Sequence, residues 1–315
     1  MIDELLKDKQ REGSFRSGFV AILGRPNVGK STFVNQLVGH KVAIVTSRPQ
    51  TTRNRIQGIV NRHNAQVVLI DTPGIHRAET PMGRLMMDEV KLALEGVDVL
   101  AVMIDASQGL RPQDRLALER ARRFQLPVIL LLNKIDRISK PALLPLLDFC
   151  SREGQFAEMI PICALSGDGV ERVLDRLISY LPEGEAYFPA DQFTDQPERF
   201  LAAEIIREKC MIATRQEIPQ ALAVLVESFE EADRLLRIHA IILVEREGQK
   251  GILIGHGGQT MKGIGTAARV ELEQILGLKV FLDLRVRVEP DWRGKSRFLR
   301  QLDWRRQLEQ LNAQE

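Results

Sequence analysis

Cysteines are few in this sequence, and long apolar runs are missing. Cys150, Cys163 and Cys210 stand far apart among the 315 residues, and no two of them form a CxxC pair. This spacing predicts neither a disulfide framework nor a zinc site, and it favours a reducing cytoplasm. The longest apolar runs, near residues 99–104 and 128–132, are far shorter than the roughly 20 residues that span a bilayer. We therefore expect any contact with a membrane to be peripheral.

An excess of one charge is missing too. The 44 basic and 42 acidic residues leave a net charge of +2, so a nucleic-acid site would have to be a local basic patch. Residues 1–14 mix both signs around one short apolar pair, a pattern that predicts no signal peptide. With 44% hydrophobic and 27% charged residues, the composition is that of a folded protein, and the length predicts two domains.

A glycine-rich stretch is the most informative feature that is present. Residues 24–31 read GRPNVGKS, follow the apolar run 19–23 and precede a helical pattern at 31–37. This strand-loop-helix context predicts a phosphate-binding loop. Gly24 and Gly29 would let successive backbone N–H groups converge on an anion, where the start of a helix adds favourable potential.

Two side chains of this stretch carry the predicted chemistry. Lys30 would reach the β- and γ-phosphates of a nucleotide, and the Ser31 hydroxyl would ligate Mg²⁺. The alternative is a glycine-rich turn that binds nothing. Eight matching positions in the expected context weigh against that alternative.

Residues 17–183 alternate apolar runs with helix-length segments. The runs 67–70, 99–104 and 128–132 are continuously apolar, as strands buried on both faces are. We predict a doubly wound α/β sheet, in which ligands bind at the carboxyl ends of the strands.

The first of these runs ends in a polar motif. Residues 71–74 read DTPG and follow the run 67–70 directly. The Asp71 carboxylate can hold the water shell of Mg²⁺, and the Gly74 N–H can reach a γ-phosphate.

A second polar motif follows the run that ends at residue 132. Residues 133–136 read NKID, and the Asp136 carboxylate can accept hydrogen bonds from both N1–H and the exocyclic amine of guanine. Adenine offers no such pair of donors, so the motif predicts guanine. Residues 163–165 read CAL near the end of the next apolar segment, where the Ala164 N–H could meet the guanine O6. Each motif alone is weak evidence for a nucleotide site, but four motifs in the right order, each at a strand end, are strong evidence for one.

These four segments resemble the GTP-binding motifs of the translation-factor-related GTPases. Residues 49–53, PQTTR, resemble the first switch region of that group's bacterial RNA-associated branch. The resemblance implies that Thr52 ligates Mg²⁺, with Thr51 as the alternative. For this stretch taken without the other motifs, the alternative is a solvated polar loop.

Two positions depart from the pattern of such GTPases. Ile75 stands directly after Gly74, where Ras-like proteins carry the glutamine that orients the attacking water. GTPases that resemble this chain share the apolar residue, and some hold K⁺ with a P-loop asparagine, here Asn27; the alternative is that Asn27 only shapes the loop. Cys163 stands where serine is usual, and we expect little effect because the base contact there comes from the backbone.

The pattern changes after residue 183. Residues 184–198 are rich in proline and polar residues and are typical of an interdomain linker. Beyond them, 204–209 has a helical pattern, 221–226 and 240–244 are strand-like, and 279–289 alternates strictly. These patterns predict a small α+β domain with a half-exposed sheet.

The second half contains a GxxG loop. Residues 255–258 read GHGG and precede a helical pattern at 260–276, the arrangement with which KH modules clamp about four nucleotides. Basic residues exceed acidic ones around the loop and again from residue 279 to residue 306. The alternatives are a plain turn and a solvated charged face. The stretch around Trp292 and Trp304 favours an amphipathic terminal helix, and stacking of the two rings on RNA is the alternative.

A GTP-binding domain followed by a KH module is the architecture of a family of bacterial GTPases, and the likeness covers nearly the whole chain from about residue 18. The resemblance implies hydrolysis of GTP to GDP and phosphate, with Mg²⁺ as cofactor and K⁺ as a further candidate. It also implies a monomer that binds the 3′ end of 16S rRNA during maturation of the 30S ribosomal subunit, in the cytoplasm with peripheral association to the inner membrane.

Two other functions fit the same residues. The chain could be a GTP-gated RNA-binding scaffold that scarcely turns over, because Ile75 removes the usual water-positioning group. It could also be a signalling switch whose target is a protein or the membrane surface. Phosphate release and crosslinking to rRNA, respectively, distinguish these alternatives from the implied function.

The sequence thus predicts specific limits and residues. The predicted parts are an N-terminal tail at 1–16, a Ras-like GTP-binding domain at 17–183, a linker at 184–198, and a type II KH domain with a C-terminal extension at 199–315. The predicted catalytic residues are Lys30, Asn27 and Thr52, and the predicted metal ligands are Ser31, Thr52 and Asp71. The predicted GTP-binding residues are Gly24, Arg25, Pro26, Asn27, Val28, Gly29, Lys30, Ser31, Thr32, Asp71, Thr72, Pro73, Gly74, Asn133, Lys134, Asp136, Cys163, Ala164 and Leu165. The predicted RNA-binding residues are Ile254, Gly255, His256, Gly257, Gly258, Lys262, Arg269, Arg285 and Arg287.

Overall fold

A computed structural model describes residues 14–48, 50–214, 218 and 221–305. Most of the predicted N-terminal tail, Pro49 of the switch motif and the end of the C-terminal extension therefore lie outside the described residues. The chain divides into two compact units: the first contains the residues up to 42 with 55–76 and 88–195, and the second contains 43–54, 77–87 and the residues from 196 on. The domain limits drawn from the sequence stay a prediction, since two short segments of the predicted first domain pack within the second unit.

The first unit contains a six-stranded sheet in the order β2-β3-β1-β4-β5-β6. Its strands are β1 (Arg16–Leu23), β2 (Ile56–Arg62), β3 (Ala65–Asp71), β4 (Val99–Asp105), β5 (Val128–Asn133) and β6 (Glu158–Pro161). β2 is antiparallel to β3, and the other neighbours are parallel. Every residue of β3 and β4 is buried, as the continuous apolar runs predicted. The predicted doubly wound fold is confirmed.

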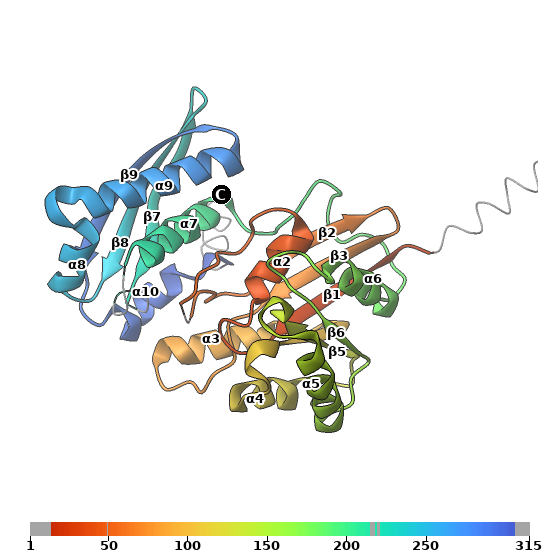
Figure 1. Cartoon of the computed structure of the whole chain (residues 1–315). Coiled ribbons are helices and arrows are strands. Elements are labelled where there is room, and N and C mark those ends of the chain that lie inside the picture. The colour runs from red at the N-terminus through yellow and green to blue at the C-terminus, as the bar shows by residue number, and fades with distance from the viewer. Residues whose placement is uncertain (1–13, 49, 215–217, 219–220, 306–315) are drawn as a thin grey trace, which may run out of the picture. The chain divides into compact units, whose positions relative to one another are not determined.

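Helices cover both faces of this sheet (Figure 1). They are α2 (Lys30–Val38), α3 (Pro81–Leu92), α4 (Pro112–Ala121), α5 (Lys140–Glu153) and α6 (Val170–Tyr180), with short 3-10 turns η1 (Ala106–Gln108) and η2 (Ile135–Arg137). α2 packs with α6 against β3, while α4 packs on β4. Gly39 ends α2 in the left-handed region at φ 75°, and its N–H donates to the Asn35 carbonyl. These helices hold the loops at the carboxyl ends of the parallel strands.

The second unit is built around a three-stranded sheet. Its elements are α7 (Glu198–Ala213), β7 (Ala223–Ala232), β8 (Leu235–Val244), α8 (Glu247–Ile254), η3 (His256–Gly258), α9 (Gln259–Leu276), β9 (Lys279–Val288), η4 (Trp292–Gly294) and α10 (Ser296–Gln301). The central strand β8 is antiparallel to β7 and parallel to β9. Figure 1 shows α7 and α9 lying along one face of this sheet, where the main apolar core forms. The predicted α+β fold is confirmed.

The other face of this sheet is less exposed than the sequence predicted. Ala223, Ile241 and Leu243 are buried there beneath a cluster that includes Trp292 and Phe298. Trp292 is 0% exposed and Trp304 4% exposed. The interpretation that these two rings stack on RNA is therefore wrong, because buried rings cannot receive a base. No helix in the described part of the chain is long and apolar enough to cross a bilayer.

Candidate nucleotide-binding and RNA-binding sites

The glycine-rich stretch forms the loop between β1 and α2, as predicted. Gly29 precedes α2 with φ 109°, a conformation that side chains disfavour. A Cβ at Gly29 would collide with the Asn133 amide, and a Cβ at Gly74 would lie 2.6 Å from the backbone nitrogen of Pro26. The loop can therefore approach the DTPG and NKID segments this closely only with glycine at these positions.

Lys30 is folded into the loop and is only 6% exposed. Its Nζ donates to the carbonyls of Gly24 at 3.2 Å and Arg25 at 3.3 Å. Burial lowers the pKa of Lys30 to about 8, although the Asp71 carboxylate acts in the opposite direction. A buried ammonium whose partners are neutral carbonyls is well placed to bind an anion, because the anion would stabilise the charge that burial disfavours.

Ser31 and Asp71, the predicted metal ligands of the first unit, lie in contact. The Ser31 hydroxyl donates to Asp71 Oδ2 at 2.6 Å, and Asp71 is 0% exposed. Two oxygen ligands at the end of a phosphate-binding loop fit Mg²⁺, which prefers oxygen and completes its shell with phosphates and water. Among the residues that the structure describes, no group of three acidic, histidine or cysteine side chains could hold a metal ion alone. The donor set thus suits a metal that arrives with a nucleotide.

The DTPG segment is anchored to β1. The Thr72 hydroxyl donates to the Ile22 carbonyl at 2.6 Å, and the Ile75 N–H donates to the Gly24 carbonyl at 3.0 Å. The Ile75 side chain is 0% exposed. This side chain therefore points into the core and cannot orient a water molecule, in agreement with the departure read from the sequence.

Asn133 connects three of the predicted segments. Its Nδ2 donates to the Val28 carbonyl at 2.7 Å, and its Oδ1 accepts from the Ala164 N–H at 2.9 Å. The P-loop, the NKID motif and the CAL segment thus meet at one buried amide. The Ala164 N–H, which we predict to meet guanine O6, donates to Asn133 in this structure, so its role toward the base stays a prediction.

The predicted specificity carboxylate is accessible and has a thiol partner. Asp136 keeps 46% of its side chain exposed, and its Oδ1 accepts a hydrogen bond from the Cys163 thiol at 3.1 Å. The sequence predicts only a backbone contact at Cys163, whereas the structure places its thiol against Asp136, the predicted specificity carboxylate. Lys134 adopts φ 68° and donates from Nζ to the Asn27 carbonyl at 2.7 Å, which ties this motif to the P-loop.

A buried acidic residue at this site was missed. Asp105 ends β4, is 0% exposed and accepts from Lys134 Nζ at 2.8 Å. Burial would raise the pKa of Asp105, but the hydrogen bonds it accepts outweigh burial and lower it. A signal was present, because Asp105 follows a continuously apolar run as Asp71 does. Nearby, Arg25 forms an ion pair with the buried Asp114 at 3.3 Å.

The remaining predicted nucleotide residues lie on the same loops and differ in exposure. Val28 and Pro73 are buried, Thr32 is half-buried, and Leu165 is 77% exposed. A side chain as exposed as Leu165 fits a position at the rim of a base site.

The two threonines of the switch motif lie in the second compact unit. The Thr51 hydroxyl donates to the Arg48 carbonyl at 2.7 Å, and Arg207 of α7 donates to the Thr51 carbonyl. Thr52 is 7% exposed. The metal-ligand role of Thr52 stays a prediction.

The GxxG loop connects α8 to α9. Gly255, Gly257 and Gly258 have φ values of 72°, 57° and 77°, which glycine adopts without strain. A Cβ added at Gly257 or Gly258 would meet nothing within 4 Å, and His256 is exposed. The loop thus presents open backbone at the start of an 18-residue helix, a position that favours anions.

A groove of about 280 Å³ lies between α9 and β9 in the same unit. It is lined by Met261, Lys262, Gly265, Thr266, Arg269, Leu282 and Leu284. Two predicted RNA-binding residues, Lys262 and Arg269, therefore line one groove with an apolar floor. Arg269 also pairs with Glu273 at 3.1 Å.

The other two predicted arginines lie on the opposite face of β9. Successive side chains of a strand alternate between its faces, and Leu282 and Leu284 line the groove. Arg285 and Arg287 consequently point away from it, and Arg285 pairs with Asp283 at 3.2 Å. The structure divides the predicted RNA-binding set between two faces of one sheet.

Comparisons with known proteins agree with both units. A family model described as "50S ribosome-binding GTPase" matches residues 19–134, and a KH-domain model matches residues 217–293. "GTPase Era" of Syntrophus aciditrophicus is 50% identical over 292 residues, covering 92% of this chain and 95% of the relative. "GTPase Era" of Geotalea uraniireducens is 48% identical over 294 residues, covering 93% of this chain and 99% of the relative.

Solved structures extend the likeness to the whole fold. An Aquifex aeolicus Era variant bound to GDP and AlF₄⁻ is 42% identical with a TM-score of 0.89, and the match covers 92% of this chain and 99% of that one. Era in complex with MgGDPNP and nucleotides 1506–1542 of 16S ribosomal RNA is 42% identical with a TM-score of 0.90 over the same shares.

The fold and the site together define a P-loop GTPase with a C-terminal KH domain. Its Lys30 loop, Ser31–Asp71 pair and NKID motif stand in one unit, and its GxxG loop stands in the other. The chain belongs to the family of the GTPase Era.

Proposed function

We propose that this chain uses GTP hydrolysis to control binding of its KH domain to the 3′ end of 16S rRNA during maturation of the 30S subunit. The observation that carries the proposal is the presence of a candidate nucleotide site and a candidate RNA site in one chain. The phosphate loop with its Ser31–Asp71 pair suits Mg²⁺-GTP, and the open GxxG loop lies at the start of α9, whose residues line the basic groove. A relative's structure with MgGDPNP and 16S rRNA nucleotides supports both halves.

Hydrolysis requires that water attack the γ-phosphorus while the bond to the β–γ bridging oxygen breaks. Lys30 and the loop N–H groups would hold the phosphates and neutralise charge that develops on them. Ser31, Asp71 and Thr52 would hold Mg²⁺, which supplies further neutralisation when bound. Because Ile75 is 0% exposed, the water must be oriented by groups other than this side chain.

K⁺ is the proposed aid to this step. The exposed Asn27 lies at the tip of the P-loop with φ 63°, and its carbonyl already accepts from Lys134. An asparagine oxygen in this position suits a monovalent cation beside the phosphates, where an arginine would act in other GTPases. Thr52 is the proposed metal ligand of the switch, because the Thr51 hydroxyl donates a hydrogen bond to the Arg48 carbonyl.

The proposed RNA surface combines the GxxG loop with the groove between α9 and β9. Ile254, Gly255, His256, Gly257 and Gly258 would let the RNA backbone approach closely, and Lys262 and Arg269 would contact its phosphates. Arg285 and Arg287 would contact RNA phosphates on the opposite face of β9. The bound RNA would therefore pass around the edge of this strand. The proposal places the chain in the cytoplasm as a monomer, with peripheral attachment to the inner membrane.

Steady-state phosphate release tests this function. We expect slow release that rises when K⁺ replaces Na⁺ and when RNA with the 3′-terminal sequence of 16S rRNA is added. Release that never exceeds the rate without protein, while GTP still binds, would favour the scaffold alternative. Crosslinking in cells that recovers protein or lipid but no rRNA would favour the signalling alternative.

A further inference from the structure

The proposed function leaves unused a cavity of about 520 Å³ inside the second unit. Its volume lies in the range of about 300–1,000 Å³ that is typical of small-molecule sites. Its walls come from the segment 43–54, the start of α3, and the elements α7, β7, β9 and α10.

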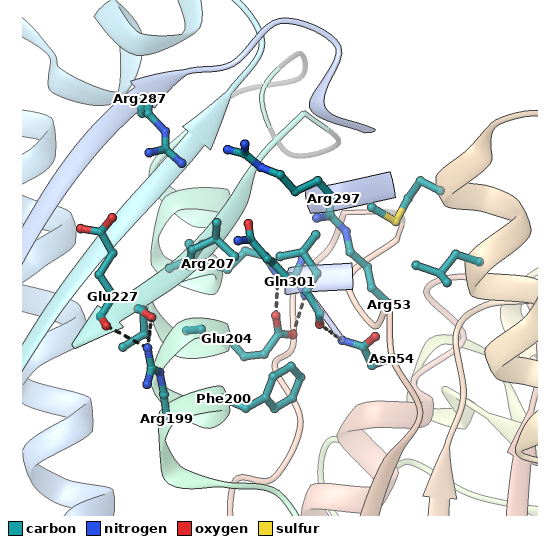
Figure 2. A pocket seen from close by; sticks show the side chains of 17 residues that line it. Arg53, Asn54, Arg199, Phe200, Glu204, Arg207, Glu227, Arg287, Arg297 and Gln301 are labelled. Carbon is teal, nitrogen blue, oxygen red and sulfur yellow. Dashed lines mark hydrogen bonds and ion pairs between the residues drawn. The ribbon is translucent and has the colours of Figure 1, made fainter. Parts of the chain in front are cut away.

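Five arginines and two glutamates line this cavity, an excess of positive charge. Arg207 is already neutralised, since it contacts Glu204 at 2.7 Å. In the part of the chain that the structure describes, Arg199, Arg287 and Arg297 form no ion pair within 4.0 Å, although the Glu289 carboxylate interacts electrostatically with Arg287 and Arg297. Figure 2 shows Arg287 and Arg297 pointing toward the same open space. An anion placed there would meet guanidinium groups from separate elements.

Arg53 adds a buried charge to the wall. It is 7% exposed, it donates to the Leu222 carbonyl at 2.7 Å, and its guanidinium carbon lies 5.8 Å from the centre of the Trp292 ring. Burial, followed by repulsion from Arg207, lowers the pKa of Arg53 to about 9. An anion beside Arg53 would offset both effects, so the cost of burying this charge favours occupation of the cavity.

The wall also carries apolar side chains, beside the polar Asn54, Glu227 and Gln301. Phe200 and Ala203 of α7 line the cavity together with Met82 and Leu85 of α3. Several guanidinium groups suit a phosphate, whose oxygens accept from more than one arginine at once. An apolar wall with an aromatic ring suits the organic part of the same molecule.

We propose that this cavity binds a small phosphorylated molecule of about mononucleotide size, with its phosphate among Arg53, Arg287 and Arg297 and its organic part against Phe200. The site is separate from the P-loop and from the GxxG loop, and it shares only Arg287 with the proposed RNA surface. Its failure would therefore leave the proposed function standing.

Adenosine 5′-monophosphate is a suitable probe, because the guanine site should reject adenine and can be filled beforehand with GDP. Intrinsic fluorescence reports on the cavity, since the two tryptophans of the chain lie beside it: Trp292 contacts Arg53, and the Trp304 ring centre lies 5.8 Å from that of Phe200. We expect a saturable change in fluorescence with AMP, saturation only at higher concentration with inorganic phosphate, and no change with adenosine. A fluorescence signal that does not saturate up to about 10 mM AMP would mean binding weaker than that of a specific site. This result would overturn the proposal.

Matched variants locate the binding. Arg297→Gln should weaken AMP binding about 10-fold to 100-fold, the cost of losing a charged hydrogen bond. Lys279→Gln removes the same charge from the start of β9, where the lysine pairs with Glu273 outside the cavity, and should leave AMP affinity unchanged. Equal weakening in both variants would show a nonspecific charge effect and refute the site. Equal competition by succinate, or loss of RNA binding but not of AMP binding in Arg297→Gln, would also refute it.

Discussion

Raising the pH should weaken GTP binding through one buried lysine. Lys30 is 6% exposed, and burial lowers its pKa to about 8 in the nucleotide-free protein. Bound phosphates favour the charged form, so the pKa of Lys30 should rise again in the complex. Between these two pKa values, binding GTP takes up a proton, and affinity falls as the pH increases.

The size of this effect follows from the pKa. With a value of about 8 in the free protein, affinity at pH 9 should be roughly 10-fold lower than at pH 7. The same burial destabilises the nucleotide-free fold below pH 8 by about 3 kcal/mol, and this cost is relieved as the pH rises from 8 toward 10.5. The free energy of unfolding without nucleotide should therefore increase across that window if this lysine dominates.

Titration with fluorescent GTP between pH 6.5 and pH 9 is the assay. Lys30→Arg keeps its charge throughout and should show little pH dependence, and Lys30→Ala should bind about 10-fold to 100-fold more weakly at pH 7. Ionisation of the guanine base would affect all three proteins alike, which the variants control for. A wild-type affinity that stays constant to pH 9, or falls equally in Lys30→Arg, would refute the reasoning.

Two further substitutions and one alkylation experiment have expected outcomes. Asp136→Asn should shift preference from GTP toward XTP by about 1–3 kcal/mol, because an amide donor suits the carbonyl of xanthine; competition binding that still strongly favours GTP would contradict this role. Trp292→Ala should lower the free energy of unfolding by about 3–5 kcal/mol, because the ring is 0% exposed and its Nε1 donates to the Ala221 carbonyl at 2.8 Å; urea denaturation measures this loss, and a change below 1 kcal/mol would contradict the packing. Burial raises the pKa of the Cys150 thiol to about 11 and that of Cys210 to about 12, so both should resist alkylation at pH 7 until the protein unfolds; mass spectrometry of native protein after iodoacetamide would detect a failure.

The sequence was most informative where residues are buried on both faces or fixed by glycine. The runs 67–70, 99–104 and 128–132 correspond to β3, β4 and β5, and the loop at 24–31 lies between β1 and α2. β2 was missed, because Ile56–Arg62 contains Gly58, Asn61 and Arg62 and lacks a continuous apolar run. Its place in the sheet depends on long-range pairing with β3, which periodicity does not reveal.

Tertiary packing explains the other differences. Arg285 and Arg287 lie in the basic stretch from residue 279 to residue 306, but strand alternation turns them away from the groove that Lys262 lines. Cys163 was read for its backbone alone, yet its thiol reaches Asp136 across 27 positions of sequence. Contacts between such distant residues depend on the fold and leave no local pattern.

Two substitutions to aspartate in the GxxG loop should abolish RNA binding and leave nucleotide binding intact. His256→Asp with Gly257→Asp adds two negative charges where phosphates would lie. Both positions have space, since His256 is exposed and a Cβ at Gly257 meets nothing within 4 Å. The φ of 57° at Gly257 is one that aspartate tolerates better than most residues, so the variant should fold.

A matched control places the same charges elsewhere. His63→Asp with Asn64→Asp adds two negative charges at the exposed turn between β2 and β3 of the first unit. Direct titration of both double variants with RNA of the 16S rRNA 3′ end, alongside GTP, tests whether the GxxG loop holds the RNA. We predict that RNA affinity collapses only in the His256/Gly257 variant, while both variants bind GTP as the wild type does. Undiminished RNA affinity in a folded His256/Gly257 variant would contradict it.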